Sequence, residues 1–323
     1  MNKLNILWNK GIYSSIKIVI KFLIAKIFKL PYAIMIEPTD LCNLKCTICY
    51  LQNTKLKREK HRMSFGEFKK LIDQVDHHII YVSLFYAGEP LINRDIYDMI
   101  AYCDEKSIIT SISTNAMLMD EKASKNLIND GLDRLIISFD GATKKSYEKI
   151  RVGAKWETVI KNIKKMMKLK KEFNSNMPFV SLQMVVTKDN EKEIDKFMKL
   201  ANKLKVDEAY VKSLYTYTTG TKEFSDKLEK LVPTKESLKR CSADKEKACQ
   251  ANFRNLVTSD GYLYPCCYDE DSRYPMGNFK EEIFSVIWRS KKYRAFRNSK
   301  EKFTKSPMCS KCGCTGEKDY KIK

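Results

Sequence analysis

Three cysteines stand close together at Cys42, Cys46 and Cys49, with the spacing C-x3-C-x2-C. Cysteine thiolates hold iron–sulfur clusters, and a complete four-iron site takes four of them. A run of three thiols leaves one iron without a protein ligand, much as a catalytic zinc site keeps one position open. The alternative is a zinc knuckle, but the nearest histidine, His61, lies beyond a Lys-rich segment. We therefore expect an iron–sulfur cluster with one open iron.

A second group of cysteines lies beyond residue 240: Cys241, Cys249, Cys266, Cys267, Cys309, Cys312 and Cys314. Residues Phe253–Val257 and Tyr262–Tyr264, joined through Asp260-Gly261, predict a β-hairpin that brings Cys249 and Cys266 to one end. With the pair Cys309 and Cys312, four thiolates can ligate every iron of a cluster. Such a cluster would serve electron transfer or structure. Zinc on the same four thiolates is the alternative, and Cys241, Cys267 and Cys314 are alternate ligands.

The elements that must position these cysteines alternate between short β-rich runs and helical, Lys-rich segments. The expected strands are Tyr32–Glu37, Ile79–Phe85, Ile108–Ser113, Leu132–Phe139, Phe179–Val186 and Glu208–Leu214. This α/β alternation predicts a parallel sheet with helices outside it. The near-continuous apolar character of the strands indicates burial on both faces. Where such a parallel sheet curls into a barrel, the residues of the active site lie at the C-terminal ends of the strands.

Two helices are predicted in more detail. Ser64, followed three residues later by Glu67, is typical of a capping box that starts a helix. A second helix, Ile96–Glu105, carries the isolated Cys103, which we expect to be a buried apolar residue.

A cysteine loop placed directly after a first strand resembles the radical S-adenosylmethionine (radical SAM) superfamily. The resemblance implies a partial (β/α)6 TIM barrel over residues 31–215, with the [4Fe-4S] cluster at the strand ends and its open iron chelated by SAM. An electron from a donor such as flavodoxin or ferredoxin would cleave SAM to a 5′-deoxyadenosyl radical, which abstracts hydrogen from the substrate. The family often has an aromatic residue just before the third cysteine. Here that residue is Ile48, and Tyr50 offers a substitute.

Several loops that follow the strands are similar to motifs of that family. Ala87-Gly88-Glu89-Pro90 resembles its G-G-E-P motif, so the resemblance implies that Gly88 and Glu89 bind the methionine amino group of SAM. Ser113-Thr114-Asn115-Ala116 stands where the family commonly has T-N-G. We expect it to support the site or to face the substrate, with a loop and helix cap as the alternative.

The loop after the fourth strand, Ser138-Phe139-Asp140-Gly141, is similar to a familiar S-x-D-G pattern. The resemblance implies that Ser138 and Asp140 contact ribose hydroxyls or the SAM carboxylate, and the alternative is that Asp140 caps the next helix. Arg151 occurs where related enzymes place an arginine facing the active site, and a guanidinium suits a carboxylate. A surface salt bridge is the alternative for Arg151.

The C-terminal block resembles the SPASM/Twitch extension of radical SAM enzymes. The matching residues are Cys249, Gly261-x4-Cys266 and Cys309-x2-Cys312, which the resemblance implies as ligands of an auxiliary [4Fe-4S] cluster. Because the sequence ends soon after Cys314, we expect the short, one-cluster Twitch form. Residues 216–240 are expected to form a linker with a bridging helix, and residues 241–323 the auxiliary domain.

Composition limits the cellular setting. The chain has 323 residues, a formal net charge of +20 and eleven cysteines, ten of which fall in the two groups above. This clustering indicates metal ligation in a reducing cytoplasm rather than disulfides. The positive charge permits an anionic partner. However, the Lys residues are spread along the chain and no nucleic-acid module is recognised, so a nucleic-acid partner is not favoured.

Residues 1–30 contain an expected basic amphipathic helix, Ser14–Leu30, which Pro31 ends. Its Lys residues, three to five positions apart, exclude a comfortable membrane span. The helix either packs across the open bottom of the barrel, which we favour, or makes a peripheral contact with the inner face of the membrane.

We expect an oxidoreductase or maturase that abstracts hydrogen from a carbohydrate-like, small-molecule or peptide substrate and oxidises it with the help of the auxiliary cluster. About thirty residues precede the barrel, too few for the winged-helix domain of many peptide maturases. A peptide substrate would then need a separate recognition partner. The other classes kept open are a nucleic-acid-modifying enzyme and a non-enzymatic metal-binding scaffold.

Overall fold

A computed structural model describes residues 10–52, 60–216, 221–239, 254–269, 272, 274–298 and 320–321. The helices of the barrel region are α2 (Gly11–Ile27), α3 (Phe65–Val75), α4 (Ile96–Glu105), α5 (Glu121–Asn129), α6 (Lys144–Ile150), α7 (Trp156–Glu172) and α8 (Ile194–Leu204). The strands are β1 (Ala33–Ile36), β2 (Tyr81–Ser83), β3 (Ile109–Thr114), β4 (Arg134–Ser138), β5 (Phe179–Val186) and β6 (Glu208–Ser213). Later elements are α9 (Lys222–Lys230), β7 (Arg254–Val257), β8 (Tyr262–Tyr264), β9 (Gly277–Asn278), α10 (Phe284–Arg289), α11 (Lys291–Asn298) and β10 (Tyr320–Lys321). Short 3-10 turns are η1 (Tyr50–Gln52), η2 (Pro90–Ile92), η3 (Glu191–Glu193) and η4 (Glu236–Leu238).

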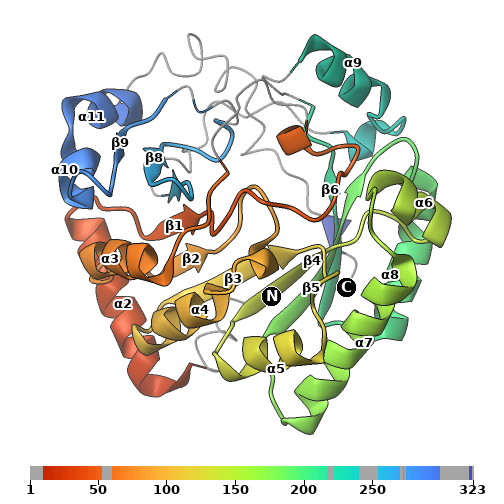
Figure 1. Cartoon of the computed structure of the whole chain (residues 1–323), viewed down its shortest axis with the longest axis horizontal. Helices are drawn as coiled ribbons and strands as arrows, with labels where there is room; N and C mark the ends of the chain where they lie inside the picture. The colour runs from red at the N-terminus through yellow and green to blue at the C-terminus, as the bar shows by residue number, and fades with distance from the viewer. Residues whose placement is uncertain are drawn as a thin grey trace.

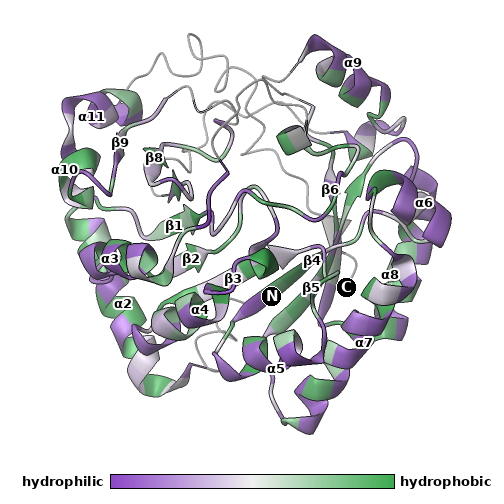
Figure 2. Ribbon diagram, in the orientation of Figure 1, coloured by the Kyte–Doolittle hydropathy of each residue, from purple (hydrophilic) through white to green (hydrophobic). Residues whose placement is uncertain are grey.

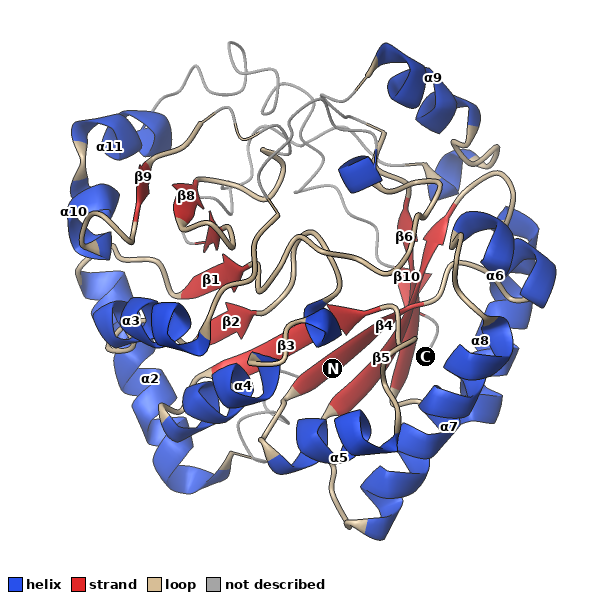
Figure 3. Cartoon of the chain, in the orientation of Figure 1, coloured by secondary structure: helices blue, strands red, loops and turns tan. Residues whose placement is uncertain are grey.

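The six predicted strands form one curved parallel sheet in chain order, β1 to β6 (Figure 1). The helices that connect them line its outer side (Figure 3), and the sheet does not close on itself, so the predicted partial TIM barrel is confirmed. Two predicted elements, Phe179–Val186 and Ile96–Glu105, have the predicted bounds. The capping box at the start of α3 is also present, with Ser64 and Glu67 as its partners. The predicted domain boundaries, after residues 30, 215 and 240, stay a prediction.

The two faces of the sheet differ in polarity. The face toward the helices is apolar, with Ile112, Leu135 and Leu182 fully buried. The opposite face carries polar side chains from β2 to β6 that contact one another: Tyr81, Ser111, Ser113, Arg134, Ser138, Ser181, Gln183, Glu208 and Tyr210. The predicted burial on both faces is confirmed at Ser111 and Ser181 of the inner face, whereas Ser113 and Ser138 are half-buried. The inner face is polar rather than apolar, because the partial barrel keeps a polar interior.

The predicted C-terminal hairpin is confirmed, and it extends the barrel sheet. β7 pairs in parallel with β1, with Met35 opposite Leu256, and β8 and β9 follow as antiparallel neighbours. The buried carboxylate of Glu37, directly after β1, accepts hydrogen bonds from Ser259 N (3.1 Å) and Oγ (2.9 Å). The hairpin and the barrel therefore share one continuous sheet.

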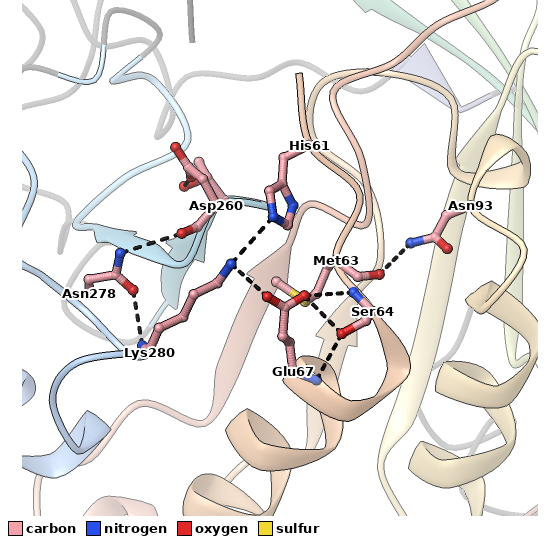
Figure 4. Close-up of polar contacts among 9 residues, drawn as sticks. His61, Met63, Ser64, Glu67, Asn93, Asp260, Asn278 and Lys280 are labelled. Atoms are coloured by element: carbon pink, nitrogen blue, oxygen red, sulfur yellow. Dashed lines mark hydrogen bonds and ion pairs between the residues drawn. The ribbon is translucent and has the colours of Figure 1, made fainter. Parts of the chain in front are cut away.

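A polar cluster also joins the C-terminal segment to α3 (Figure 4). Lys280 Nζ lies 2.7 Å from Glu67 Oε1 and 3.5 Å from His61 Nε2. Because Glu67 also completes the capping box, one carboxylate both caps the N-terminus of α3 and pairs with Lys280 of the C-terminal segment. At the opposite edge of the barrel, Tyr215 packs against Tyr268 with ring centroids 4.8 Å apart.

Helix α2 lies against the N-terminal ends of the strands, beside α3 and α4 (Figure 1). Ile18 is buried against Ile109, Ile80 and Tyr81, so the expected packing across the bottom of the barrel is confirmed. The helix spans Gly11–Ile27 instead of Ser14–Leu30, because Lys29 turns the chain with a φ of 51° before Pro31 is reached. Within the described residues, no helix combines the length and apolar character needed to cross a membrane.

Candidate functional site

The loop with the three cysteines follows β1 and is held by the loops that follow the next three strands. After β2, Glu89 N donates to Leu41 O (2.7 Å), and after β3, Asn115 Nδ2 donates to Asn43 Oδ1 (2.8 Å). Beyond β4, the carbonyls of Ile150 and Val152 accept from Thr47 N (2.8 Å) and Lys45 N (2.9 Å). The cysteine loop is therefore fixed at the C-terminal ends of the strands, as predicted from the sequence.

The three thiols are half-buried and share one electrostatic environment. Burial raises the pKa of Cys42, Cys46 and Cys49, that of Cys49 to about 12, and the nearby Arg151 guanidinium opposes the shift at each of them. The protein alone therefore holds neutral thiols at neutral pH. Because metal ligation needs thiolates, loading iron at this loop must release protons.

Gly88 and Glu89 form a tight corner after β2. Gly88 has a φ of +72°, and a Cβ there would lie 2.4 Å from Thr39 O and 2.6 Å from Leu41 O, so no larger residue fits. The Glu89 side chain is buried and accepts hydrogen bonds from Thr114 Oγ1 (2.6 Å) and Asn115 N (2.8 Å), while burial raises its pKa. Its carboxylate thus joins the β2 and β3 loops. Binding of the SAM amino group at this corner stays a prediction.

Asp140 and Arg151 form a buried ion pair beside the cysteines. Asp140 Oδ2 lies 2.9 Å from Arg151 Nε and 2.7 Å from Nη2, and Oδ1 accepts from Val185 N at 2.8 Å. Burial alone would lower the pKa of Arg151, but Asp140 and Cys46 outweigh it and the pKa is raised. The pair is therefore not a surface salt bridge. Asp140 does not cap α6 either, since Thr143 does.

Ser138 ends β4 on the polar inner face, where its Oγ lies 3.3 Å from Ser113 Oγ. It is half-buried and stands two residues before the Asp140–Arg151 pair. The predicted contacts of Ser138, Asp140 and Arg151 with SAM stay predictions, but the structure brings the three onto the same strand-end region as the cysteine loop.

Two supporting residues escaped the sequence analysis. Asn190 Nδ2 donates to Asp140 O (3.2 Å) and Val185 O (2.9 Å), which holds the β4 loop against the end of β5. Asn43, inside the cysteine loop, bonds Asn115. Both are ordinary loop residues in the sequence. Only the position of Asn43 between two candidate ligands gave any signal.

Of the predicted auxiliary ligands, only Cys266 lies in the described part of the chain. It follows β8, where its backbone carbonyl accepts from Asp269 N (3.2 Å), and the alternate ligand Cys267 is next to it. Cys249, Cys309 and Cys312 lie outside the described residues, as do the alternates Cys241 and Cys314. The arrangement of the four predicted ligands is therefore untested.

The chemistry of the cysteine loop fits an iron–sulfur cluster. It provides three partly accessible thiols, a neighbouring cation, and a glycine corner at which backbone can approach a ligand closely. In the described ranges, no three His, Cys, Asp or Glu side chains converge on a point that would hold a single metal ion.

Comparison with known proteins gives consistent matches. The Radical SAM superfamily profile matches residues 36–201, just over half of the chain. The SPASM profile, an iron–sulfur cluster-binding domain, matches residues 249–313, a span that includes all four predicted auxiliary ligands. Domains of these two kinds bind a SAM-chelating [4Fe-4S] cluster and auxiliary clusters, respectively.

Individual relatives carry different activities. The chain is 24% identical over 317 residues to the tungsten-containing aldehyde ferredoxin oxidoreductase cofactor-modifying protein of Pyrococcus furiosus, with 88% of each chain covered. It is 22% identical over 256 residues to the PqqA peptide cyclase of Granulibacter bethesdensis, which covers 79% of this chain and 65% of that protein. Streptococcus suis SuiB bound to its precursor peptide SuiA superposes with a TM-score of 0.66 at 19% identity, over 93% of this chain and 75% of that one. At that identity the superposition shows the fold alone.

Proposed function

Because this chain belongs to the radical SAM superfamily and carries a SPASM iron–sulfur domain, we propose that it oxidises a polar small molecule after hydrogen abstraction. When bound, the cluster at Cys42, Cys46 and Cys49 supplies the reductive cleavage of SAM that starts this reaction. The observation that supports the proposal is the cysteine loop, fixed at the C-terminal ends of four parallel strands.

The residues of the chain position the reactants in this proposal. The corner at Gly88 and Glu89 would bind the ammonium group of SAM through backbone carbonyls, since the Glu89 carboxylate already accepts hydrogen bonds from Thr114 and Asn115. Arg151 uses two N–H groups on Asp140 and has three more donors, which suit a carboxylate. Val185 N donates to Asp140 Oδ1, and Asp140 Oδ2 in turn orients that guanidinium.

The polar inner face supports a substrate rich in hydroxyl groups. Tyr210 Oη donates to Gln183 Oε1 (2.9 Å), Ser138 is the register partner of Gln183, and Ser138 Oγ lies 3.3 Å from Ser113 Oγ. Serine, glutamine and tyrosine side chains both donate and accept hydrogen bonds, as sugar-like hydroxyls require. A peptide substrate is the second candidate, because the matched relatives include a PqqA peptide cyclase and a structure of SuiB with its precursor peptide.

The auxiliary cluster is proposed to accept the electron left on the substrate after hydrogen abstraction. A cluster ligated by four thiolates, Cys249, Cys266, Cys309 and Cys312, has no vacancy for SAM, so its role is electronic or structural. A donor such as flavodoxin or ferredoxin would supply the first electron. The clustering of cysteines supports a cytoplasmic location, where thiols stay reduced.

The test uses anaerobically reconstituted full-length protein, with iron and sulfide counted and 5′-deoxyadenosine measured. We expect the variant with Ala at Cys42, Cys46 and Cys49 to lose SAM cleavage and about one cluster of iron, while the auxiliary iron remains. Cys103→Ala is the matched control, because Cys103 is fully buried in α4 and belongs to neither group of cysteines in the sequence, and it should keep both properties. Continued 5′-deoxyadenosine formation by the triple variant would refute the assignment.

A second variant separates the auxiliary role from SAM cleavage. Cys266→Ala should still cleave SAM but yield much less oxidised product. If Cys266→Ala keeps the wild-type product yield, the proposed electron-accepting role is wrong.

A further inference from the structure

The outer side of α2 carries an apolar stripe that the described part of the chain leaves exposed. We use the name outer stripe for Ile12, Ile16, Val19, Ile20, Leu23 and Ile27, each of which is more than half exposed. Their spacing of three, four and seven residues places them along one side of the helix. The inward side is narrow and includes the buried Ile18 and Ala25. An exposed apolar surface of this extent marks an interaction site.

The orientation of α2 is fixed, so the outer stripe cannot simply roll inward. Lys10 Nζ lies 2.6 Å from Asp104 Oδ1 and 2.8 Å from Asp133 Oδ2, and Lys21 Nζ donates to Lys106 O at 2.6 Å. At the other end, Trp288 Nε1 donates to Lys29 O at 3.2 Å. Polar ties near both ends thus hold the same side of the helix against the barrel. Figure 2 shows the mixture of apolar and polar residues along α2.

The charges around the outer stripe indicate what covers it. Residues 1–36 contain six Lys and no Asp or Glu. At 100° per residue, Lys17 and Lys26 project on opposite sides of the stripe. Apolar side chains flanked by lysines match the boundary between acyl chains and anionic headgroups. A second copy of the chain would bring like charges together, which disfavours self-association through this surface.

We propose that α2 docks the protein on an anionic phospholipid bilayer, with the outer stripe in the headgroup region and Lys17 and Lys26 near the phosphates. This inference is independent of the proposed reaction. Because α2 lies at the N-terminal ends of the strands, the cysteine loop at their C-terminal ends faces away from the lipid. The substrate would then enter from the aqueous side.

The test is flotation of the full-length protein with vesicles of phosphatidylcholine alone or with one-third phosphatidylglycerol. We expect binding to the anionic vesicles only, weakened by high salt. Ile16→Ser/Ile20→Ser/Leu23→Ser should reduce the partition coefficient at least about tenfold. Lys17→Gln and Lys26→Gln should each reduce it about fivefold.

Leu118→Ser is the control, because Leu118 is 41% exposed and lies in the loop after β3, at the opposite ends of the strands from α2. It should bind vesicles as the wild type does, and circular dichroism should show all variants folded. Three results would overturn the proposal: no binding of the wild type to anionic vesicles, equal binding to both vesicle types, or unchanged binding by the triple serine variant. Gel filtration that shows a wild-type dimer without vesicle binding would assign the outer stripe to a second copy instead.

Discussion

Asp140→Asn tests the buried ion pair most directly. The substitution keeps the size of the side chain and an oxygen that can accept from Val185 N, but it removes the charge that faces Arg151. The exposed fractions of the two side chains are only 1% and 14%, so water cannot replace the lost partner. Removing one member of a buried pair costs about 3–5 kcal/mol, because the other charge stays buried and uncompensated.

The assay is the urea midpoint of anaerobically reconstituted protein, compared at equal iron content because bound clusters also stabilise the fold. Glu157→Gln is the matched control. The Lys144–Glu157 pair has the same 2.7 Å separation, but both side chains are more than half exposed. That control should change stability little or not at all.

A double variant distinguishes the lost pair from a general defect. Asp140→Asn/Arg151→Met removes both charges, so it should be more stable than Asp140→Asn alone. If Asp140→Asn shifts the midpoint no more than Glu157→Gln does, the loss of Asp140 does not leave Arg151 as a buried, uncompensated charge. The same conclusion holds if the double variant is the less stable of the two.

Two further predictions concern stability. Gly88→Ala should destabilise the protein by at least about 3 kcal/mol in urea, because its Cβ would overlap two backbone carbonyls at a positive φ. Gly66→Ala, in α3 with open space around it, should instead stabilise by about 0.5–1 kcal/mol, and equal midpoints for the two variants would contradict this reasoning. Burial lowers the pKa of His78 to about 4, below its unfolded value near 6.5, so protonation favours unfolding. The free energy of unfolding should therefore be highest above pH 6.5 and fall by about 3 kcal/mol as the pH drops to 4. His78→Asn should flatten this part of the pH profile of stability. If His78→Asn and the exposed neighbour variant His77→Asn give the same profile, His78 does not titrate as described.

Local signals predicted the barrel well. The strand and helix periods, the capping box at Ser64 and the order of the loops each depend on residues close together in the sequence, and all are present. The pairing of β7 with β1 could not be predicted, because the two strands are more than two hundred residues apart in the sequence and no local pattern links them.

The site was predictable in its members but not in its contacts. Motif spacing identified Gly88, Asp140 and Arg151, yet it gave two roles for Asp140 and two for Arg151. Only the three-dimensional arrangement shows that Asp140 binds Arg151 and that Thr143 caps α6. Asn190 was not predicted, because a single polar residue before a helix can have many roles. Its hydrogen-bond partner, Asp140 O, is fifty residues away in the sequence.

The strand pairing of β1 has a consequence for the solubility of any shortened form. β1 reads Ala33-Ile34-Met35-Ile36, and its second side is covered by β7. A chain that stopped before β7 would expose the hydrogen-bonding groups of this apolar strand along an open edge. Such an edge is a template for pairing with other chains and for aggregation. The C-terminal segment therefore protects the barrel from self-association, whatever the cluster that it holds contributes to the chemistry.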